Sequence, residues 1–337
     1  MKTRLFLAAL TLLCCHVVPN VSGTALQQKE SSRGAPVSPE LEEARRLSEQ
    51  VVSLHYQGRF DEALPMARRA LEIREKQLGA DNELVGHALK NVASLYFAKK
   101  QYGAAAKLYQ RTLSVYEKVF PPNDIRTAAI LDNLGWSSYG DGDTGKAERC
   151  LLRALTIREA ARGPESSDVA EALFVLGQFY QKLGKAGKAV ETYQRAIRIR
   201  EKSLGPDDPA FRELLEKCSC ALTQMGRNEE AEQMRARRFK GDAGSTKAVG
   251  SVLQGHAVFR AEPAYPSAAK AERVSGTVIV EVTVDETGKV INTRAVCGHD
   301  LLVPASVDAA KHWRFSPTLL SGRPVKVIGT ITFNFNL

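Results

Sequence analysis

Residues 175–209 read VLGQFYQKLGKAGKAVETYQRAIRIREKSLGPDDP, and this stretch decides the fold. Leu176 and Tyr180 are four residues apart, which places them on one face of a helix, and Ala189 and Tyr193 have the same spacing in the following segment. Glycine and alanine among these residues let two helices approach closely. The stretch therefore predicts a helix hairpin.

The hairpin recurs with a period of 42 residues. One set of positions at this spacing is Gly58, Lys100, Gly142, Gly184 and Gly226, and a second is Ala63, Ala105, Ala147, Ala189 and Ala231. A single hairpin cannot bury its own apolar face, so neighbouring hairpins must stack into a continuous core. We therefore expect about five units over residues 40–240, in a helical solenoid whose concave surface binds a partner.

The residues of the fourth unit resemble the signature of the tetratricopeptide repeat. They are Leu176, Gly177, Tyr180, Ala189, Tyr193 and Ala196. The unit is longer than the common form of about 34 residues, and its extended second helix, from Ala196 to Leu204, resembles the repeats of kinesin light chains and their bacterial relatives. The fifth unit loses the pattern after Ala231, as a polar capping unit should.

Two sets of residues mark the expected helix ends. Glycines expected at positive φ, after helices, are Gly79, Gly163 and Gly205. Residues expected to cap the helices that follow are Asp81, Asp124, Ser167 and Asp207.

The hydrophobic period changes after the repeats. Residues 241–260 gain glycine and predict a linker. Beyond them, Thr277–Asp285 and Lys289–Val296 alternate as a strand hairpin, Pro304–Trp313 is helical in pattern, and Pro324–Asn336 alternates again. The expected fold is thus mainly α, a solenoid followed by a small α+β domain of order β-β-α-β over residues 261–337.

This second domain resembles the C-terminal domain of the TonB family. The resemblance is carried by Pro263-x-Tyr265-Pro266, Val284-Asp285-x-x-Gly288, Ala309-Ala310-x-x-Trp313-x-Phe315-x-Pro317, Gly322-x-Pro324-Val325 and Phe333-x-Phe335. It implies capture of an extended segment of an outer-membrane transporter by strand addition, with the last strand as the edge. The docking residues that the resemblance implies are Tyr265, Pro266, Val325, Val327, Ile331, Phe333 and Phe335.

The first residues predict export. Residues 1–23 combine Lys2 and Arg4 with a short apolar run and a small-residue end, which is the pattern of a signal peptide. Residues 24–39 are polar and predict a flexible leader. A retained anchor and lipidation at Cys14 or Cys15 are the alternatives. The family's membrane helix carries a histidine with a serine four residues earlier, whereas this chain has Leu12 four residues before His16.

Four cysteines lie beyond that segment. Cys150 and Cys218 occupy positions where other units carry apolar residues, so we expect them to fill the core. Cys220 points to a different side of its helix from Cys218, because residues two apart do not face each other. The sequence shows no disulfide framework. Cys297 precedes Gly298-His299-Asp300, which could suggest a metal ligand set, but no second cluster accompanies it and a structural role is favoured.

The sequence lacks signals of catalysis and of nucleic-acid binding. It contains no nucleophile motif, phosphate loop or HExxH. The formal net charge of +9 is spread among acidic residues on helix surfaces, without an arginine-rich run. Glu165 with Asp168, and Asp207 with Asp208, resemble paired carboxylates, but they lie in turns where capping explains them. We therefore expect no enzyme activity, no cofactor, no metal and no nucleic-acid partner.

The concave surface is the better candidate site. Its expected residues, on the first helix of units two to four, are His87, Lys90, Asn91, Phe97, Asp132, Asn133, Trp136, Tyr139, Phe174, Gln178 and Gln181. Amides and aromatic rings suit an extended peptide, whose backbone needs hydrogen bonds and whose side chains need apolar contact. The alternative is that Trp136 and Phe174 only pack between repeats.

These features predict a non-enzymatic adaptor of the bacterial cell envelope. Its repeat groove would bind a protein or peptide, and its TonB-like domain would dock on an envelope or outer-membrane component, such as a transporter. The expected location is the periplasm or cell envelope. The alternative is a TonB-type energy transducer for outer-membrane transport, with an uncleaved N-terminal anchor.

Overall fold

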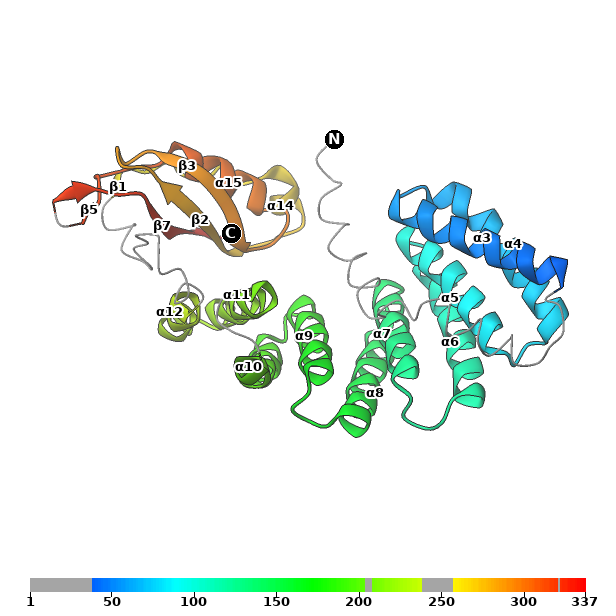
Figure 1. Cartoon of the computed structure of the whole chain (residues 1–337). Helices are drawn as coiled ribbons and strands as arrows, with labels where there is room; N and C mark the ends of the chain where they lie inside the picture. Colours follow the sequence, from blue (N-terminus) through cyan, green and yellow to red (C-terminus); the bar gives the residue numbers. More distant parts are fainter. Residues whose placement is uncertain (1–37, 204–207, 238–256, 321) are drawn as a thin grey trace. The chain divides into compact units, whose positions relative to one another are not determined.

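The computed structural model describes residues 38–203, 208–237, 257–320 and 322–337 (Figure 1). The chain divides into two compact units, Met1–Pro164 and Glu165–Leu337. The first contains the helix pairs α3 (Pro39–Tyr56) with α4 (Phe60–Leu78), α5 (Glu83–Ala98) with α6 (Tyr102–Val119), and α7 (Ile125–Gly140) with α8 (Thr144–Arg162). The second contains α9 (Ser167–Lys182) with α10 (Ala186–Ser203), and α11 (Pro209–Gln224) with α12 (Asn228–Arg237), followed by the C-terminal domain. The mainly helical fold class is confirmed.

The first helix of each unit begins where a side chain can satisfy the first backbone N–H groups, whereas α4 and α6 begin without a side-chain cap. Ser38 caps α3 ahead of Pro39, and Asp124 caps α7 as predicted. The caps of α5 and α9 are Asn82 and Ser166, so the predictions of Asp81 and Ser167 were each wrong by one residue. The predicted cap at position 207 lies outside the described residues, and Asp208 caps α11. Several polar residues adjoin each boundary, and only backbone geometry selects among them.

The turn between the two helices of each unit uses the same backbone conformation. Positive φ occurs at all five equivalent positions, which are Gly58, Lys100, Gly142, Gly184 and Gly226. Four of them are glycine, which adopts this region without a Cβ clash, whereas Lys100 adopts it at φ 61°. Gly79 and Gly163 also have positive φ, as predicted. The prediction for position 205 lies outside the described residues.

The 42-residue period corresponds to repeated packing. The five alanines of the second set are all fully buried, at 0% exposure. Between α9 and α10 the helices are so close that a Cβ on Gly177 would lie 2.4 Å from the Tyr193 ring. Tyr109 and Leu151 occupy the position of Tyr193 in the preceding units, and both are buried. Small residues on one helix thus accommodate a large one on its partner.

Ion pairs on the surface follow the same period. Arg111 pairs with Glu75 at 2.6 Å and Arg153 with Glu117 at 2.6 Å, in successive units. Arg237 and Glu201 repeat the pair in the second half of the chain, also at 2.6 Å. Each pair connects second helices of successive units, and each contributes little alone because it is exposed.

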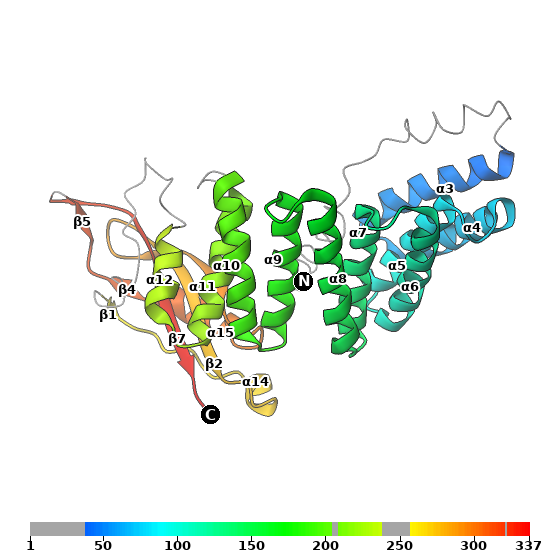
Figure 2. The ribbon, with the colours of Figure 1, turned by 90° about the horizontal axis from the view of Figure 1, so that it is seen from below.

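The C-terminal domain is built on a three-stranded antiparallel sheet of order β3-β2-β7 (Figures 1 and 2). Its strands are β2 (Gly276–Val284), β3 (Val290–Cys297) and β7 (Val327–Phe335). Helix α15 (Val303–His312) contacts β2 and β3. The smaller elements are β1 (Ala257–Phe259), α14 (Ser267–Ala271), β4 (Arg314–Phe315), β5 (Leu319–Leu320) and β6 (Arg323–Pro324).

Strand β1 was not expected, because it lies within the range predicted as linker. It pairs with β4, which follows α15. A three-residue strand carries no periodic signal of its own, and only its distant partner makes it a strand. The predicted order β-β-α-β holds for the long elements β2, β3, α15 and β7.

One face of the sheet forms the core of the domain. Val278, Val280, Val282 and Val284 alternate along β2 and pack with residues of α15 and β7. Trp313, at the end of α15, donates its Nε1–H to the carbonyl of Ala261 at 2.8 Å. This bond satisfies the indole N–H and ties the entry segment to the core.

Candidate functional site

The predicted site residues of unit two lie on α5. His87, Lys90 and Asn91 are partly exposed, whereas Phe97 is buried. The Phe97 ring packs edge-on against Tyr102 of α6, with ring centroids 5.4 Å apart. Phe97 therefore joins the two helices of the unit, and the three polar side chains are those that reach the surface.

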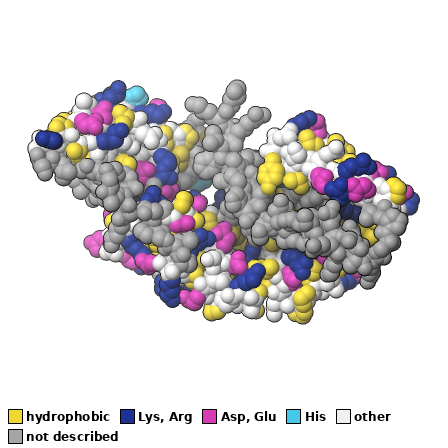
Figure 3. Space-filling view, in the orientation of Figure 1, with side chains coloured by type: hydrophobic (Ala, Val, Ile, Leu, Met, Phe, Trp, Pro, Cys, Tyr) yellow, Lys and Arg dark blue, Asp and Glu magenta, His cyan; other side chains and the backbone are white. Residues whose placement is uncertain are grey.

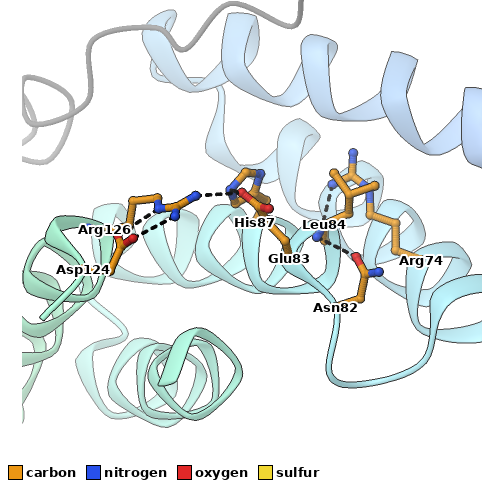
Figure 4. Close-up of polar contacts among 7 residues, drawn as sticks. All are labelled: Arg74, Asn82, Glu83, Leu84, His87, Asp124 and Arg126. Carbon is orange, nitrogen blue, oxygen red and sulfur yellow. Dashed lines mark hydrogen bonds and ion pairs between the residues drawn. The ribbon is translucent and has the colours of Figure 1, made fainter. Parts of the chain in front are cut away.

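His87 lies in a polar cluster at the start of α5 (Figure 4). Its Nε2 is 3.8 Å from Glu83 Oε1, and its ring packs edge-on against Tyr116. Burial lowers the pKa of His87 to about 4, and the positive charges of Lys90 and nearby arginines act in the same direction. The imidazole is therefore neutral near pH 7, where it can donate and accept hydrogen bonds.

Arg126 of α7 orders the same cluster. Its guanidinium binds Asp124 Oδ2 at 2.8 Å and Glu83 Oε1 at 3.2 Å, and it lies 3.4 Å from the centroid of the Phe120 ring. The hydrogen bond from Arg126 lowers the pKa of the Asp124 carboxyl. Figure 4 shows Arg126 beside Asp124 and the Glu83 and His87 side chains of α5, and the Phe120 ring packs on the same guanidinium.

The predicted residues of unit three lie on α7 and divide in the same way. Asn133 and Tyr139 are partly exposed, whereas Trp136 is buried and packs edge-on against Tyr139 at 5.8 Å. Asp132 is turned toward α8, where it forms an ion pair with Arg158, whose side chain is 3% exposed. Burial raises the pKa of Asp132, and the charge of Arg158 opposes that rise.

The predicted residues of unit four lie on α9. Phe174 is buried, with its ring 6.1 Å from that of Tyr193. Gln178 and Gln181 are partly exposed. Gln181 accepts a hydrogen bond from the Tyr193 hydroxyl at 3.1 Å through its Oε1, and its Nε2 donates to Cys220 Sγ at 3.1 Å. The amide is thereby fixed in one orientation.

On α5, α7 and α9, the predicted polar side chains are therefore partly exposed, and the rings of Phe97, Trp136 and Phe174 are buried. Trp136 and Phe174, the two rings named in the packing alternative, are buried, and so is Phe97. The partly exposed residues that a ligand could contact are His87, Lys90, Asn91, Asn133, Tyr139, Gln178 and Gln181. Figure 3 shows basic and acidic side chains next to one another on the face it displays, without a large field of one sign.

The second predicted site is the edge strand β7. It pairs in register with β2 from Gly276↔Phe335 to Val284↔Val327. Within the described residues no strand pairs with its other side. Backbone groups of alternate residues point to that side, where an added strand can bond to them.

The predicted docking side chains support that edge from inside. Those of β7, namely Val327, Ile331, Phe333 and Phe335, are buried in the domain core. Tyr265 packs edge-on against Phe335 at 5.3 Å, and its hydroxyl donates to the Val274 carbonyl at 2.6 Å. Pro266 precedes α14, and Val325 packs against the core. A ligand at β7 would therefore meet backbone groups and the side chains that alternate with these.

Sequence reasoning missed a disulfide bond between Cys220 of α11 and Cys297 of β3. Cys150 and Cys218 are free and buried, as predicted. Elimination could have predicted the bond. If Cys150 and Cys218 fill the core, Cys220 and Cys297 are the two cysteines left to pair. While the bond is intact, Cys297 cannot serve as a thiolate metal ligand.

Of the two acidic pairs, Glu165 and Asp208 have structural partners, and position 207 lies outside the described residues. Glu165 forms an ion pair with Lys202 at 2.8 Å, and Asp208 accepts hydrogen bonds from the N–H groups of Ala210 and Phe211. Over the described ranges, no group of three or more His, Cys, Asp or Glu side chains is arranged to hold a metal ion. Over the same ranges, none of the helices has the length and apolar character needed to cross a membrane.

Comparison with known proteins identifies both domains. The tetratricopeptide repeat model matches residues 42–118, 91–160, 126–202 and 168–237, and the model of the Gram-negative bacterial TonB protein C-terminal domain matches residues 261–337. Protein TonB of Vibrio cholerae serotype O1 is 35% identical over 66 residues, which are 19% of this chain and 27% of that protein. The match thus spans about a quarter of that relative.

Solved structures show the fold of the repeats. The TPR-like repeats of a putative kinesin light chain from Podosopora anserina superpose with a TM-score of 0.55 at 20% identity, covering 61% of this chain and 99% of that one. BtubC (BKLC) from P. vanneervenii gives a TM-score of 0.53 at 21% identity, covering 66% and 92%. The chain belongs to the tetratricopeptide repeat family, with repeats like those of kinesin light chains, and ends in a TonB-type C-terminal domain.

Proposed function

We propose that this protein is a non-enzymatic adaptor of the bacterial cell envelope, with one binding surface in each domain. Both domains belong to families of binding modules, and the TonB-type domain points to the envelope. The repeats would bind an extended protein segment along their first helices, and the C-terminal domain would add a strand from an envelope partner to β7. The observation that supports this proposal is the position of β7 at the end of the described sheet, where β2 is the strand it pairs with.

For the repeats, the contacting groups are the half-exposed amides and lysine of the first helices. Asn91 and Asn133 are equivalent residues of units two and three, and Val175 has this position in unit four. An asparagine can donate to and accept from a peptide backbone at once, which suits an extended ligand. Buried rings beneath them keep the helices in place rather than supply contact area.

Peptide selection on the mature full-length protein tests the first surface. Peptides from a random displayed library would be selected and their affinities measured. We expect Asn91→Ala and Asn133→Ala each to weaken binding by about 1 kcal/mol or more. Thr192→Ala is the matched control, since this exposed side chain of a second helix bonds only to the Lys188 carbonyl of its own helix. Equal affinity in all variants would refute a groove on the first helices.

A proline scan from Ile328 to Asn334 tests the second surface. Proline removes one backbone N–H, so it destroys the fold where that N–H bonds to β2 and is tolerated where the N–H faces outward. The probe is an extended peptide of a TonB-dependent outer-membrane transporter. We expect folded variants with an outward-facing proline to lose binding, whereas Thr283→Ala on β2 should retain it. Retained binding in every folded variant would exclude strand addition at β7.

The TonB relative supports a second candidate, an energy transducer held in the inner membrane by an uncleaved N-terminus. Mass spectrometry of the protein from fractionated cells separates the two. A mature N-terminus near Thr24 in the soluble periplasmic fraction supports the adaptor. An intact Met1 in the inner membrane supports the transducer, and a lipid on Cys14 or Cys15 indicates a tethered adaptor.

A further inference from the structure

Two residues of α11 occupy positions that we predicted to contact ligands in other units. Glu216 lies 42 residues after Phe174, and so is equivalent to Lys90 and Asp132. Cys220 lies 42 residues after Gln178, and so is equivalent to Trp136. The first helix of the fifth unit thus carries its own version of the candidate binding surface.

The C-terminal domain contacts both of these positions. Cys220 is bonded to Cys297 of β3, and the pair is buried in a cluster with Ile279 and Val296. These residues lie on β2 and β3, on the sheet face that carries Ile279 rather than the valines of the domain core. An apolar patch on that face is therefore covered by α11.

An ion pair adjoins the disulfide. The Arg294 guanidinium donates to both carboxylate oxygens of Glu216, at 3.0 and 2.9 Å, and to Glu281 Oε1 at 3.3 Å. The fork of an arginine on a carboxylate fixes direction as well as distance. The contact is thus specific, with an apolar, a covalent and a charged part on one helix face.

The contact reaches a further predicted site residue. Gln181 of α9 donates its amide N–H to the sulfur of Cys220. The disulfide therefore lies directly beside the amide that would serve a ligand in unit four. A ligand that extends from Gln178 and Gln181 onto α11 must compete with the sheet.

We propose that the C-terminal domain occupies the fifth unit's share of the repeat groove, and that the Cys220–Cys297 bond locks it there until a dithiol reductant releases it. The inference rests on the proposed groove and adds its regulation. Two events follow from release. The first helix α11 becomes accessible to a peptide ligand, and the Ile279 face of the sheet becomes accessible to a partner of the C-terminal domain.

The redox step needs one reagent. The dithiol supplies two electrons and two protons, its own sulfurs become a disulfide, and the bond between Cys220 and Cys297 breaks to give two thiols. After reduction, only the apolar patch and the Arg294–Glu216 pair hold the contact. The Arg294 side chain is 44% exposed, so solvent screens the pair, and the reduced contact opens far more often.

Disulfide mapping is the first test. The full-length protein is purified from the envelope, alkylated without reduction and digested. We expect one linked peptide pair containing Cys220 and Cys297, and alkylation of Cys150 and Cys218 only after denaturation. Recovery of Cys220 and Cys297 as free thiols would overturn the proposal.

Hydrogen exchange is the second test, because it needs no ligand. We expect reduction to speed amide exchange in Phe211–Gln224 and in β3 by about tenfold or more, while α7 stays unchanged. Cys297→Ser should show the fast exchange without reductant, and Glu216→Gln should speed it further after reduction. Cys150→Ala is the control and should behave as the wild type.

The outcomes separate this inference from the proposed function. If exchange in α11 is the same before and after reduction, the bond is no lock and the inference fails, whatever the peptide selection shows. If reduction opens α11 but Asn91→Ala and Asn133→Ala bind peptides normally, the lock stands and its role in groove binding is refuted.

Discussion

Helices α7 and α11 carry a carboxylate at the same position of the repeat, yet one pairs with an arginine of its own unit and the other with an arginine of the C-terminal domain. Asp132 of α7 turns inward to Arg158 of its own unit. Glu216 of α11 turns to Arg294 of the C-terminal domain. The repeat determines the position of the carboxylate on its helix. The nearest cation determines the orientation of the side chain.

The difference follows from the second helices. Arg158 recurs 42 residues later as Arg200, but the next equivalent position is Asp242. The fifth unit therefore offers Glu216 no arginine at the position that Asp132 uses. In α7 the pair joins the two helices of one unit, whereas in α11 the carboxylate pairs with an arginine of the C-terminal domain.

The largest expected difference in stability is between variants that lack one or the other carboxylate. Asp132→Ala leaves the Arg158 charge buried without its partner, at an expected cost of about 3–5 kcal/mol. Glu216→Ala leaves Arg294, whose side chain is 44% exposed, so we expect a loss below about 1 kcal/mol. Denaturant midpoints from circular dichroism measure both. Equal losses would mean that the two positions do not differ in kind.

A second comparison concerns glycines on equivalent positions of α7 and α9. A Cβ on Gly177 would lie 2.4 Å from the Tyr193 ring, whereas a Cβ on Gly135 would lie 3.0 Å from Leu151. We expect Gly177→Ala to destabilise by about 1–3 kcal/mol, and Gly135→Ala by less.

Gly187→Ala is the control for these glycines. The nearest atom to its added Cβ is Met225 Cε at 3.9 Å, so the change should be neutral or slightly stabilising. Thermal unfolding of the three variants gives the order. A larger loss for Gly135→Ala than for Gly177→Ala would contradict the packing described between α9 and α10.

Protonation of His87 should destabilise the second repeat unit. The pKa is about 6.5 in the unfolded chain and about 4 in the folded one, so between these values the unfolded state binds the additional proton. The contribution of His87 is complete above pH 6.5 and is lost as pH falls toward 4. Because the ring is 31% exposed, we expect a loss of about 1–2 kcal/mol. A His87→Asn variant with the same pH slope as the wild type would contradict this assignment.

The smallest expected effect lies in the turns after α5 and α7. Lys100 has a φ of 61°, in the region that its equivalent Gly142 occupies at 91°. We expect Lys100→Gly to stabilise by about 1 kcal/mol or less, and Gly142→Ala to destabilise by a similar amount. Melting temperatures of the two variants should move in opposite directions. A shift in the same direction would show that the turn does not limit stability.

The periodic parts of the molecule were predictable. Buried alanines and turn glycines recur because each unit repeats one packing problem, and the alternation in β2 and β7 reports one buried face. Cap positions were less predictable, since Asn82 and Ser166 cap their helices in place of the neighbouring residues Asp81 and Ser167. Strand β1 was not predictable, because its partner β4 lies far along the chain.

The candidate site was predictable in position but not in exposure. Spacing places Lys90, Asn91 and Asn133 on the first helices, but it cannot show that Phe97 and Phe174 are covered by second helices. Burial depends on the size of the residue opposite, which periodicity does not report.

The sequence by itself determined the 42-residue units, the change of period that separates the two domains, and the family of each. Only the tertiary structure decided which cysteines join, which carboxylates turn inward, and which rings are buried. Local spacing determines the face of a helix or strand on which a residue lies, because the backbone repeats regularly. Partners 26 residues apart, such as Asp132 and Arg158, or 77 apart, such as Cys220 and Cys297, meet only when packing brings their elements together.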